Sequence, residues 1–237
     1  MPRVRLAFIT GASSGLGQAL AWRFYLAGYR LALVARRTSD VQDWIRMQGM
    51  EPGSCEVYGA DVSVTDSLVL AGRQCMDRQG VPDVVIACAG ISIGVDTAER
   101  SDIDVMARTF ATNNVGTAAT FHPFLAEMKQ RRSGKLVGIG SVNGIRGFAG
   151  HGANCPSKAA LISYCECLRV ELNNSGVNVV TLCPGYIATP LTKQNSYSMP
   201  FLMSPEDFAE RAFKAIDAGA SYRVIPWQMG IVAKLLR

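Results

Sequence analysis

The sequence lacks the features that would place this protein across a membrane or on nucleic acid. It has no stretch of about 20 apolar residues, the length that a membrane-spanning helix needs. The opening "MPRVRLAFITGAS" has no apolar run long enough for a signal peptide before its first glycine. Lys and Arg number 24 against 19 acidic residues, but they are scattered and form only short pairs such as Arg36-Arg37. We therefore expect a cytoplasmic protein that binds no nucleic acid and makes no membrane contact.

The sequence also has no C-x-x-C pair, and its seven cysteines are an odd number. This argues against a disulfide framework and favours a reduced, cytosolic setting. No metal site is predicted. Repeats, low-complexity tracts and linkers are absent, so we expect one domain over residues 1–237 that ends in a tail at 226–237. The tail is apolar with spaced cations, and packing against the domain is favoured over resting on a bilayer or on a partner subunit.

What the sequence does contain is an alternation of short apolar runs and helix-length segments, which is typical of β-α-β units around a parallel sheet. The runs lack polar alternation, as strands covered on both faces do. The expected strands lie at 4–10, 29–35, 55–61, 83–89, 134–140, 177–183 and 222–226. The expected helices lie at 16–28, 65–79, 102–131 with a break, 153–174 and 205–218. The predicted fold class is therefore α/β, a single-domain Rossmann-type doubly wound parallel sheet with helices on both faces.

The first motif with chemical meaning is "TGASSGLG", Thr10 to Gly17, between the first expected strand and the first expected helix. A glycine-rich turn at this junction lets backbone N–H groups and the positive end of a helix approach a pyrophosphate without obstruction. A tight turn that holds no ligand is the alternative, but a position near the start of a β-α-β chain favours a dinucleotide site. The residues expected to contact the dinucleotide here are Gly11, Ser13, Ser14, Gly15, Leu16 and Gly17.

The end of the second expected strand indicates which dinucleotide binds. No acidic residue stands where a carboxylate would accept a hydrogen bond from the ribose 2′-hydroxyl, and Arg36 and Arg37 follow the strand instead. Guanidinium groups bind phosphate through two parallel hydrogen bonds, so the pair favours the 2′-phosphate of NADP(H). Two solvated arginines at a strand end are the alternative.

Further motifs follow along the chain. They are Asp61-Val62 after the third strand, "CAG" at Cys88 to Gly90, Asn113 in "TNNVGT", Ser141 in "IGSVNG", Lys158 in "CPSK" and "PGYIAT" at Pro184 to Thr189. Together with the glycine-rich turn, this set resembles the short-chain dehydrogenase/reductase family, and the likeness runs from Val4 to about Pro226. The combination is highly specific, although each piece alone is weak.

The resemblance implies roles for these residues. Asp61 and Val62 would hold the adenine ring, and "CAG", with Cys88, Ala89 and Gly90, stands in place of the family's usual N-A-G. Asn113 and Ser141 match the active-site asparagine and serine, and Lys158 the lysine that holds the nicotinamide ribose. The segment with Pro184, Gly185, Ile187 and Thr189 would contact the nicotinamide amide. The implied activity is NADP(H)-dependent interconversion of carbonyl and alcohol.

The sequence departs from the family's Y-x-x-x-K motif, because the residue four positions before Lys158 is Asn154. Asn154 is also thirteen residues after Ser141, the usual separation of the tyrosine. A phenol next to an ammonium can exchange the proton that the reaction requires, whereas an amide donates hydrogen bonds without exchanging a proton near neutral pH. We therefore predict impaired turnover with cofactor binding mostly spared.

Three explanations remain open at this stage. The chain is an active-site variant of an ordinary reductase, or a catalytically silent NADP(H)-binding sensor or scaffold protein, or another group replaces the phenol. Tyr186 and His151 are the candidates for such a replacement. Cys88 and Cys155 lie near the site in sequence, but no histidine partner indicates a thiolate nucleophile.

The substrate is only weakly indicated. The segment Leu191 to Met203 is rich in Met, Phe and Tyr and follows the expected nicotinamide contact, so we expect it to close over an apolar pocket. An apolar small-molecule alcohol or ketone is the corresponding prediction, and a loop that packs at a subunit boundary is the alternative. The family resemblance implies a homodimer or homotetramer paired through helices 102–131 and 153–174.

Overall fold

The computed structural model describes residues 4–193 and 198–235 and contains one sheet of seven parallel strands in the order β3-β2-β1-β4-β5-β6-β7. The strands are β1 (Leu6–Thr10), β2 (Arg30–Ala35), β3 (Cys55–Gly59), β4 (Val84–Ala87), β5 (Gly134–Ile139), β6 (Val177–Pro184) and β7 (Tyr222–Ile225). Each lies within a run expected to be a strand or, for β6, extends it by one residue. The doubly wound α/β fold is confirmed.

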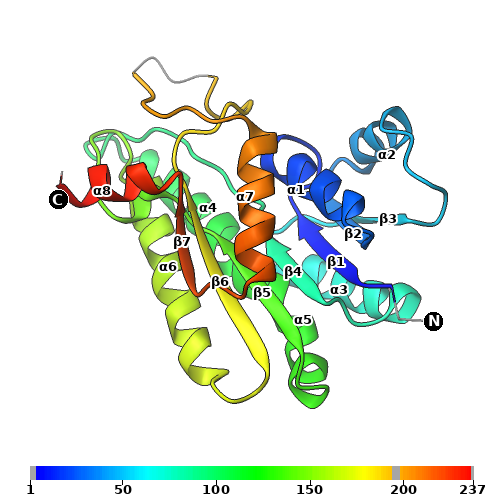
Figure 1. Cartoon of the computed structure of the whole chain (residues 1–237). Coiled ribbons are helices and arrows are strands. Elements are labelled where there is room, and N and C mark those ends of the chain that lie inside the picture. The colour runs from blue at the N-terminus through cyan, green and yellow to red at the C-terminus, as the bar shows by residue number, and fades with distance from the viewer. Residues whose placement is uncertain (1–3, 194–197, 236–237) are drawn as a thin grey trace.

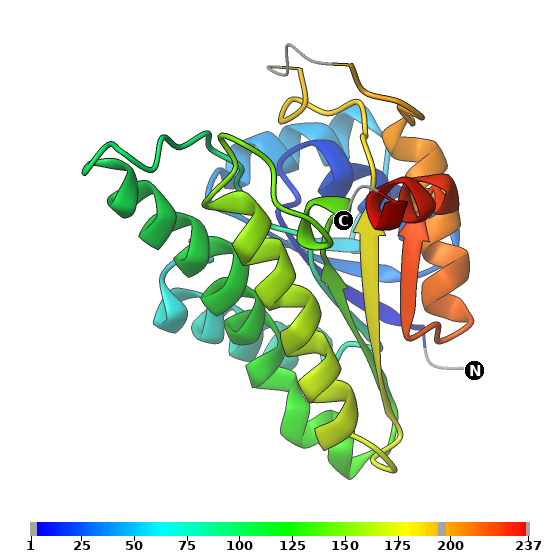
Figure 2. The ribbon, with the colours of Figure 1, turned by 90° about the vertical axis from the view of Figure 1, so that its left-hand side faces the viewer.

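Helices cover both faces of the sheet (Figures 1 and 2). They are α1 (Gly15–Leu26), α2 (Thr38–Met47), α3 (Thr65–Gln79), α4 (Asp102–Phe110), α5 (Gly116–Gln130), α6 (Asn154–Glu171), α7 (Pro205–Asp217) and α8 (Trp227–Leu235). One core contains residues of α1, α2 and α7, and a second core on the other face contains residues of α3, α5 and α6. Buried rings such as Phe24 in the first core and Phe124 in the second hold the layers together.

Two helical features depart from the sequence expectation. The expected break within 102–131 is a π-helical turn, Ala111–Val115, that joins α4 to α5. Helix α2 was not expected, although Val41 and Trp44 on its inner face are buried in the core. The expected tail forms α8, whose Met229 and Ala233 pack in a small cluster with Val142. The last two residues of the tail lie outside the described residues.

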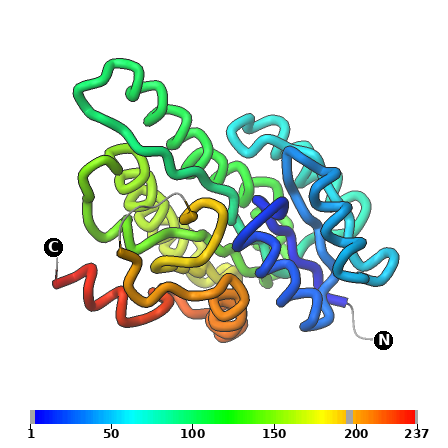
Figure 3. The backbone as a smooth tube through the Cα atoms, turned by 90° about the horizontal axis from the view of Figure 1, so that it is seen from above, coloured from blue at the N-terminus to red at the C-terminus, as the bar shows by residue number. Residues whose placement is uncertain are grey.

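Backbone hydrogen bonds join the beginning and the end of the segment between β6 and α7. Ile187 and Met203 form an isolated parallel bridge, Ala188 N–H donates to the Met203 carbonyl, and Met203 N–H donates to the Tyr186 carbonyl. Chain at both ends of the segment is therefore anchored beside the carboxyl end of β6, and Figure 3 shows this stretch, in yellow and orange, next to the turn after β1. Residues 194–197 of the segment expected to cover the pocket lie outside the described residues. In the part of the chain that is described, no helix is long and apolar enough to cross a membrane.

Candidate active site

A cavity of about 940 Å³ lies at the carboxyl ends of the parallel strands, where β1 and β4 are neighbours and the strand order reverses direction. This is the position at which doubly wound sheets bind ligands. Most of the residues predicted to contact a dinucleotide line it: Gly11, Ser13, Ser14, Gly15, Leu16, Gly17, Arg36, Arg37, Asp61, Val62, Cys88, Ala89, Gly90 and Thr189. Residues distant in sequence thus meet around one cavity.

The glycine-rich turn is packed so closely that side chains would not fit at two of its positions. Gly11 has φ +73°, and a Cβ there would lie 2.8 Å from the Ala89 Cα. A Cβ at Gly17 would lie 2.1 Å from the Gly11 carbonyl oxygen. These contacts bring the start of α1 against the end of β4, so that the N-terminal end of α1 borders the cavity.

Thr10 also fixes this junction. Its Oγ1 accepts hydrogen bonds from the backbone N–H groups of Cys88, at 3.1 Å, and Ala89, at 3.3 Å. The side chain is 1% exposed. In the sequence, only the place of Thr10 as the first residue of the glycine-rich motif indicates this role.

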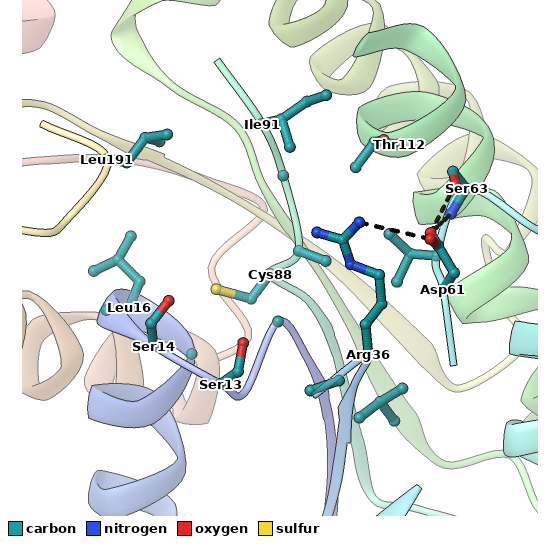
Figure 4. A pocket seen from close by; sticks show the side chains of 18 of the residues that line it. Ser13, Ser14, Leu16, Arg36, Asp61, Ser63, Cys88, Ile91, Thr112 and Leu191 are labelled. Atoms are coloured by element: carbon teal, nitrogen blue, oxygen red, sulfur yellow. Dashed lines mark hydrogen bonds and ion pairs between the residues drawn. The ribbon is translucent and has the colours of Figure 1, made fainter. Parts of the chain in front are cut away.

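Both arginines at the end of β2 have carboxylate partners, and Figure 4 shows the pair formed by Arg36. Arg36 extends across the cavity, and its guanidinium lies 3.7 Å from the Asp61 carboxylate. Hydrogen bonds from Ser63, together with Arg36, hold the pKa of Asp61 below its ordinary value. Arg37 is paired with Asp40 in the first turn of α2. A third cation, Arg108 on α4, lines the same cavity and was not singled out from the sequence.

A second cavity, of about 160 Å³, adjoins the first. The two share six lining residues: Leu16, Cys88, Gly90, Ile91, Thr189 and Leu191. The remaining predicted site residues that line the second cavity are Ser141, Asn154, Lys158, Pro184, Gly185 and Ile187. His151 and Tyr186, the two possible substitutes for a phenol, line it as well.

Lys158 lies at the centre of this arrangement. Its Nζ donates a hydrogen bond to the Ile139 carbonyl at 2.9 Å, which fixes the ammonium at the end of β5. Burial lowers the pKa of Lys158, and the neighbouring Cys88 and Cys183 act in the opposite direction. Burial also raises the pKa of Cys88 to about 12, so this thiol is protonated at neutral pH and is a poor nucleophile.

Ser141 follows β5, and its Oγ accepts a hydrogen bond from the Asn143 N–H at 3.1 Å. Its own hydroxyl hydrogen therefore remains available to a ligand in the cavity.

Asn113 lies behind the site and lines neither cavity. It is fully buried in the π-helical turn, where its amide exchanges two hydrogen bonds with the backbone of Ile91 and donates a third to Ser157 Oγ. A Cβ at Gly90 would lie 3.2 Å from Asn113 Oδ1 and 3.6 Å from Lys158 Nζ. Asn113 thus holds in place the backbone of Gly90 and Ile91, which lies between the Asn113 side chain and the cavity.

Asn154 is the first residue of α6 and is 4% exposed. Its Oδ1 is buried and has no hydrogen-bond partner among the described residues. The position four residues before Lys158 thus carries an amide whose buried oxygen has no partner among the described residues. No titratable group stands there.

The model of the short chain dehydrogenase family matches residues 5–199 of this sequence. The chain belongs to the short chain dehydrogenase family. As a short chain dehydrogenase it is an oxidoreductase by family, and members of the family bind a nicotinamide cofactor and act on small molecules. An uncharacterized oxidoreductase of Myxococcus xanthus is 36% identical over 98% of this chain and 92% of its own length.

Solved structures of other oxidoreductases share the fold. An alcohol dehydrogenase from Thermococcus sibiricus, complexed with 5-hydroxy-NADP, has a TM-score of 0.81 and 24% identity over 94% of this chain and 96% of its own. A 3-ketoacyl-(acyl-carrier-protein) reductase from Brucella melitensis, complexed with NADH, has a TM-score of 0.82 and 24% identity over 93% and 94%. These neighbours carry different nicotinamide cofactors, so they leave the choice of cofactor open for this short chain dehydrogenase.

Proposed function

We propose that this chain binds NADP(H) in the larger cavity and interconverts a carbonyl and an alcohol in the adjoining one, at a rate limited by Asn154. The observation that carries the proposal is the shared wall: Ser141, Asn154 and Lys158 line a cavity that is continuous in its lining with the glycine-rich turn. The proposal takes residues 1–237 as a single functional domain.

The residues of the larger cavity suit NADP(H). The N-terminal end of α1 would receive the pyrophosphate, and Asp61 and Val62 would border the adenine. Arg36 and Arg37 would bind the 2′-phosphate after leaving the carboxylates of Asp61 and Asp40. No carboxylate follows β2 directly, where it would repel that phosphate. Support for NADP(H) over NAD(H) comes from these charges.

The chemistry divides between the cofactor and the protein. A nicotinamide supplies or accepts the hydride, and the protein must orient the substrate oxygen and manage its proton. Ser141 has a free O–H to orient that oxygen, and Lys158 would hold the nicotinamide ribose. Asn154 donates or accepts hydrogen bonds but does not exchange a proton near neutral pH. Placed acid–base groups contribute roughly 10²–10⁴ in rate, and the proposal assigns a loss of this size to Asn154.

The direct experiment compares the chain with Asn154→Tyr. We expect NADPH to bind both proteins with similar affinity in a fluorescence titration, and the tyrosine variant to reduce apolar ketones about 10²–10⁴ times faster. The change restores a phenol that titrates beside the Lys158 ammonium. Absence of NADPH binding would overturn the whole proposal, and an unchanged rate would overturn the role of Asn154.

Two further variants test whether another side chain replaces the phenol. If His151 or Tyr186 supplies the proton, His151→Gln or Tyr186→Phe will remove the residual turnover of the unmodified chain and leave NADPH affinity intact. If neither variant changes the residual rate, water supplies the proton in the unmodified chain.

The buried amide also favours a second function, that of a catalytically silent NADP(H)-binding sensor or scaffold protein. A non-titrating side chain at the proton-exchange position preserves the cofactor cavity while removing the acid. In that case NADPH binds, but neither this chain nor Asn154→Tyr turns over any member of a ketone panel. The same two measurements therefore separate the two functions.

A further inference from the structure

The larger cavity is bordered by an arginine without an acidic partner. Arg108 is an exposed residue of α4 that lines this cavity, and it forms no ion pair with any described residue. Asp104, four residues earlier on the same helix, is at the spacing from which a carboxylate pairs with a cation, but it lies 3.9 Å from Arg100 instead. The Arg108 guanidinium can therefore bind an anionic ligand without giving up a carboxylate.

Arg108 borders the same part of the cavity as Arg36. The end of α4 and the π-helical turn contribute Arg108, Ala111 and Thr112 to the lining, at a spacing of three and four residues that places them on one side of the helix. Figure 4 shows Thr112 beside the space into which the Arg36 guanidinium extends. Because one helical turn rises only about 5.4 Å, the long side chain of Arg108 can reach this space from the side opposite β2.

Close packing fixes this wall of the cavity against the residues that follow β3. Gly116 is the first residue of α5, directly after the π-helical turn, and a Cβ there would lie 2.7 Å from the Val62 carbonyl oxygen. The turn that carries Thr112 is thus held next to Asp61 and Val62. Arg36 and Arg108 therefore face each other across a space whose width the fold determines.

This space is at the end of the cavity away from the second cavity. The six lining residues that the two cavities share mark the end where the proposed function puts the nicotinamide, and neither Arg36 nor Arg108 is among them. A 2′-phosphate on the adenosine ribose carries about 1.5 to 2 negative charges at neutral pH. Arg36 and Arg37 each leave a carboxylate to bind it, whereas Arg108 breaks no ion pair.

We infer that Arg108 binds the 2′-phosphate of NADP(H) from α4, on the side facing Arg36, and is a determinant of the preference for NADP(H) over NAD(H). The inference rests on the proposed function, which puts NADP(H) in this cavity. It assigns part of the cofactor choice to a helix that lies outside both the glycine-rich turn and the end of β2. The competing outcome is a contact with the pyrophosphate or the adenine, which NAD(H) also carries.

The test is a fluorescence titration of NADPH and of NADH into the full chain and into Arg108→Gln, which removes the charge but keeps a polar side chain. We expect NADPH to bind the variant about tenfold more weakly, the effect of one charge-assisted hydrogen bond, and NADH to bind within about twofold. Arg211→Gln is the matched control and should change neither affinity, because Arg211 is an exposed arginine on α7 that lines neither cavity. Retained NADH binding also shows that Arg108→Gln is folded.

Two further measurements assign the contact to the 2′-phosphate. Adenosine 2′,5′-bisphosphate and 5′-AMP differ only in that phosphate, and both are titrated as competitors of NADH. The bisphosphate should lose about tenfold in affinity for Arg108→Gln, and 5′-AMP should lose little. Arg108→Lys keeps the charge without the planar fork of donors, and it should recover part of the NADPH affinity.

Equal losses of NADPH and NADH affinity in Arg108→Gln would put the guanidinium on a group common to both cofactors and overturn the inference. Unchanged affinities for both cofactors would show that the side chain is merely solvated, which overturns it as well. Failure of the unmodified chain to bind NADPH, or tighter binding of NADH than of NADPH, would instead remove the proposed NADP(H) function before any variant is made.

Discussion

Arg36 enters the cofactor cavity already engaged with Asp61, so binding of a 2′-phosphate replaces one ionic contact with another. The side chain is 65% exposed, and water screens its attraction to the carboxylate. A phosphate that accepts two parallel hydrogen bonds from the guanidinium is the stronger partner. We therefore expect the 2′-phosphate of NADP(H) to displace the Asp61 carboxylate from Arg36.

We predict that Arg36→Ala weakens NADPH binding roughly tenfold and changes NADH binding little, since only NADPH carries the 2′-phosphate. Fluorescence titration with both cofactors measures the two affinities. Arg46→Ala, which removes an exposed cation from α2 that is paired with Asp43, is the control and should change neither. A parallel loss for NADPH and NADH in Arg36→Ala would contradict a phosphate-specific role.

Lys158 makes stability depend on pH. Burial lowers its pKa below the ordinary 10.5, so the unfolded chain binds this proton more tightly than the folded chain. The resulting destabilisation is complete below the folded-state pKa and disappears as pH rises past 10.5. One pH unit between the two pKa values corresponds to about 1.4 kcal/mol.

We therefore predict that Lys158→Met, compared with the unmodified chain, is relatively more stable at neutral pH than at alkaline pH. Urea unfolding of both cofactor-free proteins across this range measures the difference in their free energies of unfolding. Loss of the hydrogen bond to the Ile139 carbonyl changes the variant's free energy of unfolding by the same amount at every pH. It therefore does not affect the dependence on pH. Parallel stability curves would show that the lysine is not destabilised by burial.

At the scale of elements, α3 and α5 touch through a glycine. Gly72 is in the middle of α3, and a Cβ there would lie 2.7 Å from Pro123 Cγ, in a rigid ring on α5. Alanine is normally favoured over glycine inside a helix by about 1 kcal/mol. Here the close approach of the two helices opposes that preference.

We predict that Gly72→Ala destabilises the fold by about 1–3 kcal/mol, because the overlap with Pro123 exceeds the gain in helix propensity. Chemical denaturation measures the change. Arg73→Ala, at the next and exposed position of the same helix, should stay within about 0.5 kcal/mol of the unmodified chain. A stabilised Gly72→Ala would mean that α5 moves away from α3 at little cost.

The strands and helices differ in how well the sequence alone predicts them. All seven strands were predictable. The five inner strands are rich in Val, Ile, Leu and Ala, as occurs where both faces of a sheet are covered, whereas the edge strands β3 and β7 are shorter in apolar sequence and more exposed. Helix α2 was not named from the sequence, although Val41 and Trp44 are spaced as on one face of a helix and are both buried. The π-helical turn was expected only as a break, because its conformation depends on Asn113 bonding to Ile91, a contact between distant segments.

The same distinction holds for the site. The glycine-rich turn was predictable from its place between a strand and a helix, and Ser141 and Lys158 were predictable from the family resemblance. All three line two adjoining cavities. The pairing of Arg36 with Asp61 and the orphaned oxygen of Asn154 were not, because both depend on side chains from other elements or on their absence. Arg108 gave no signal, since nothing in its sequence neighbourhood distinguishes it from a solvated helix residue.

At the scale of the whole molecule, α4, α5 and α6 lie in one layer on the same side of the sheet (Figure 2). Ile103 on α4, Val115 in the π-helical turn that follows α4, and Val170 on α6 are between 50% and 78% exposed. Apolar side chains gathered on one face indicate an interaction surface. They agree with the expected pairing of subunits through these helices.

We predict a homodimer or homotetramer whose mass falls toward that of one chain in Val170→Asp, because a buried unpaired carboxylate is unfavourable at an interface. Light scattering after size-exclusion chromatography measures the mass. Met47→Asp, on the opposite layer and 76% exposed, should leave the assembly unchanged. A single-chain mass for the unmodified protein at high concentration would refute the assembly.

The bridge between Ile187 and Met203 has a consequence for how the protein can be altered. Because backbone hydrogen bonds join the two stems, the sequence between them can be exchanged as a cassette without disturbing β6 or α7. Grafting residues 192–202 from a relative, with Thr189, Pro190 and Leu191 of the cofactor cavity kept, should transfer the relative's substrate range onto an unchanged cofactor site.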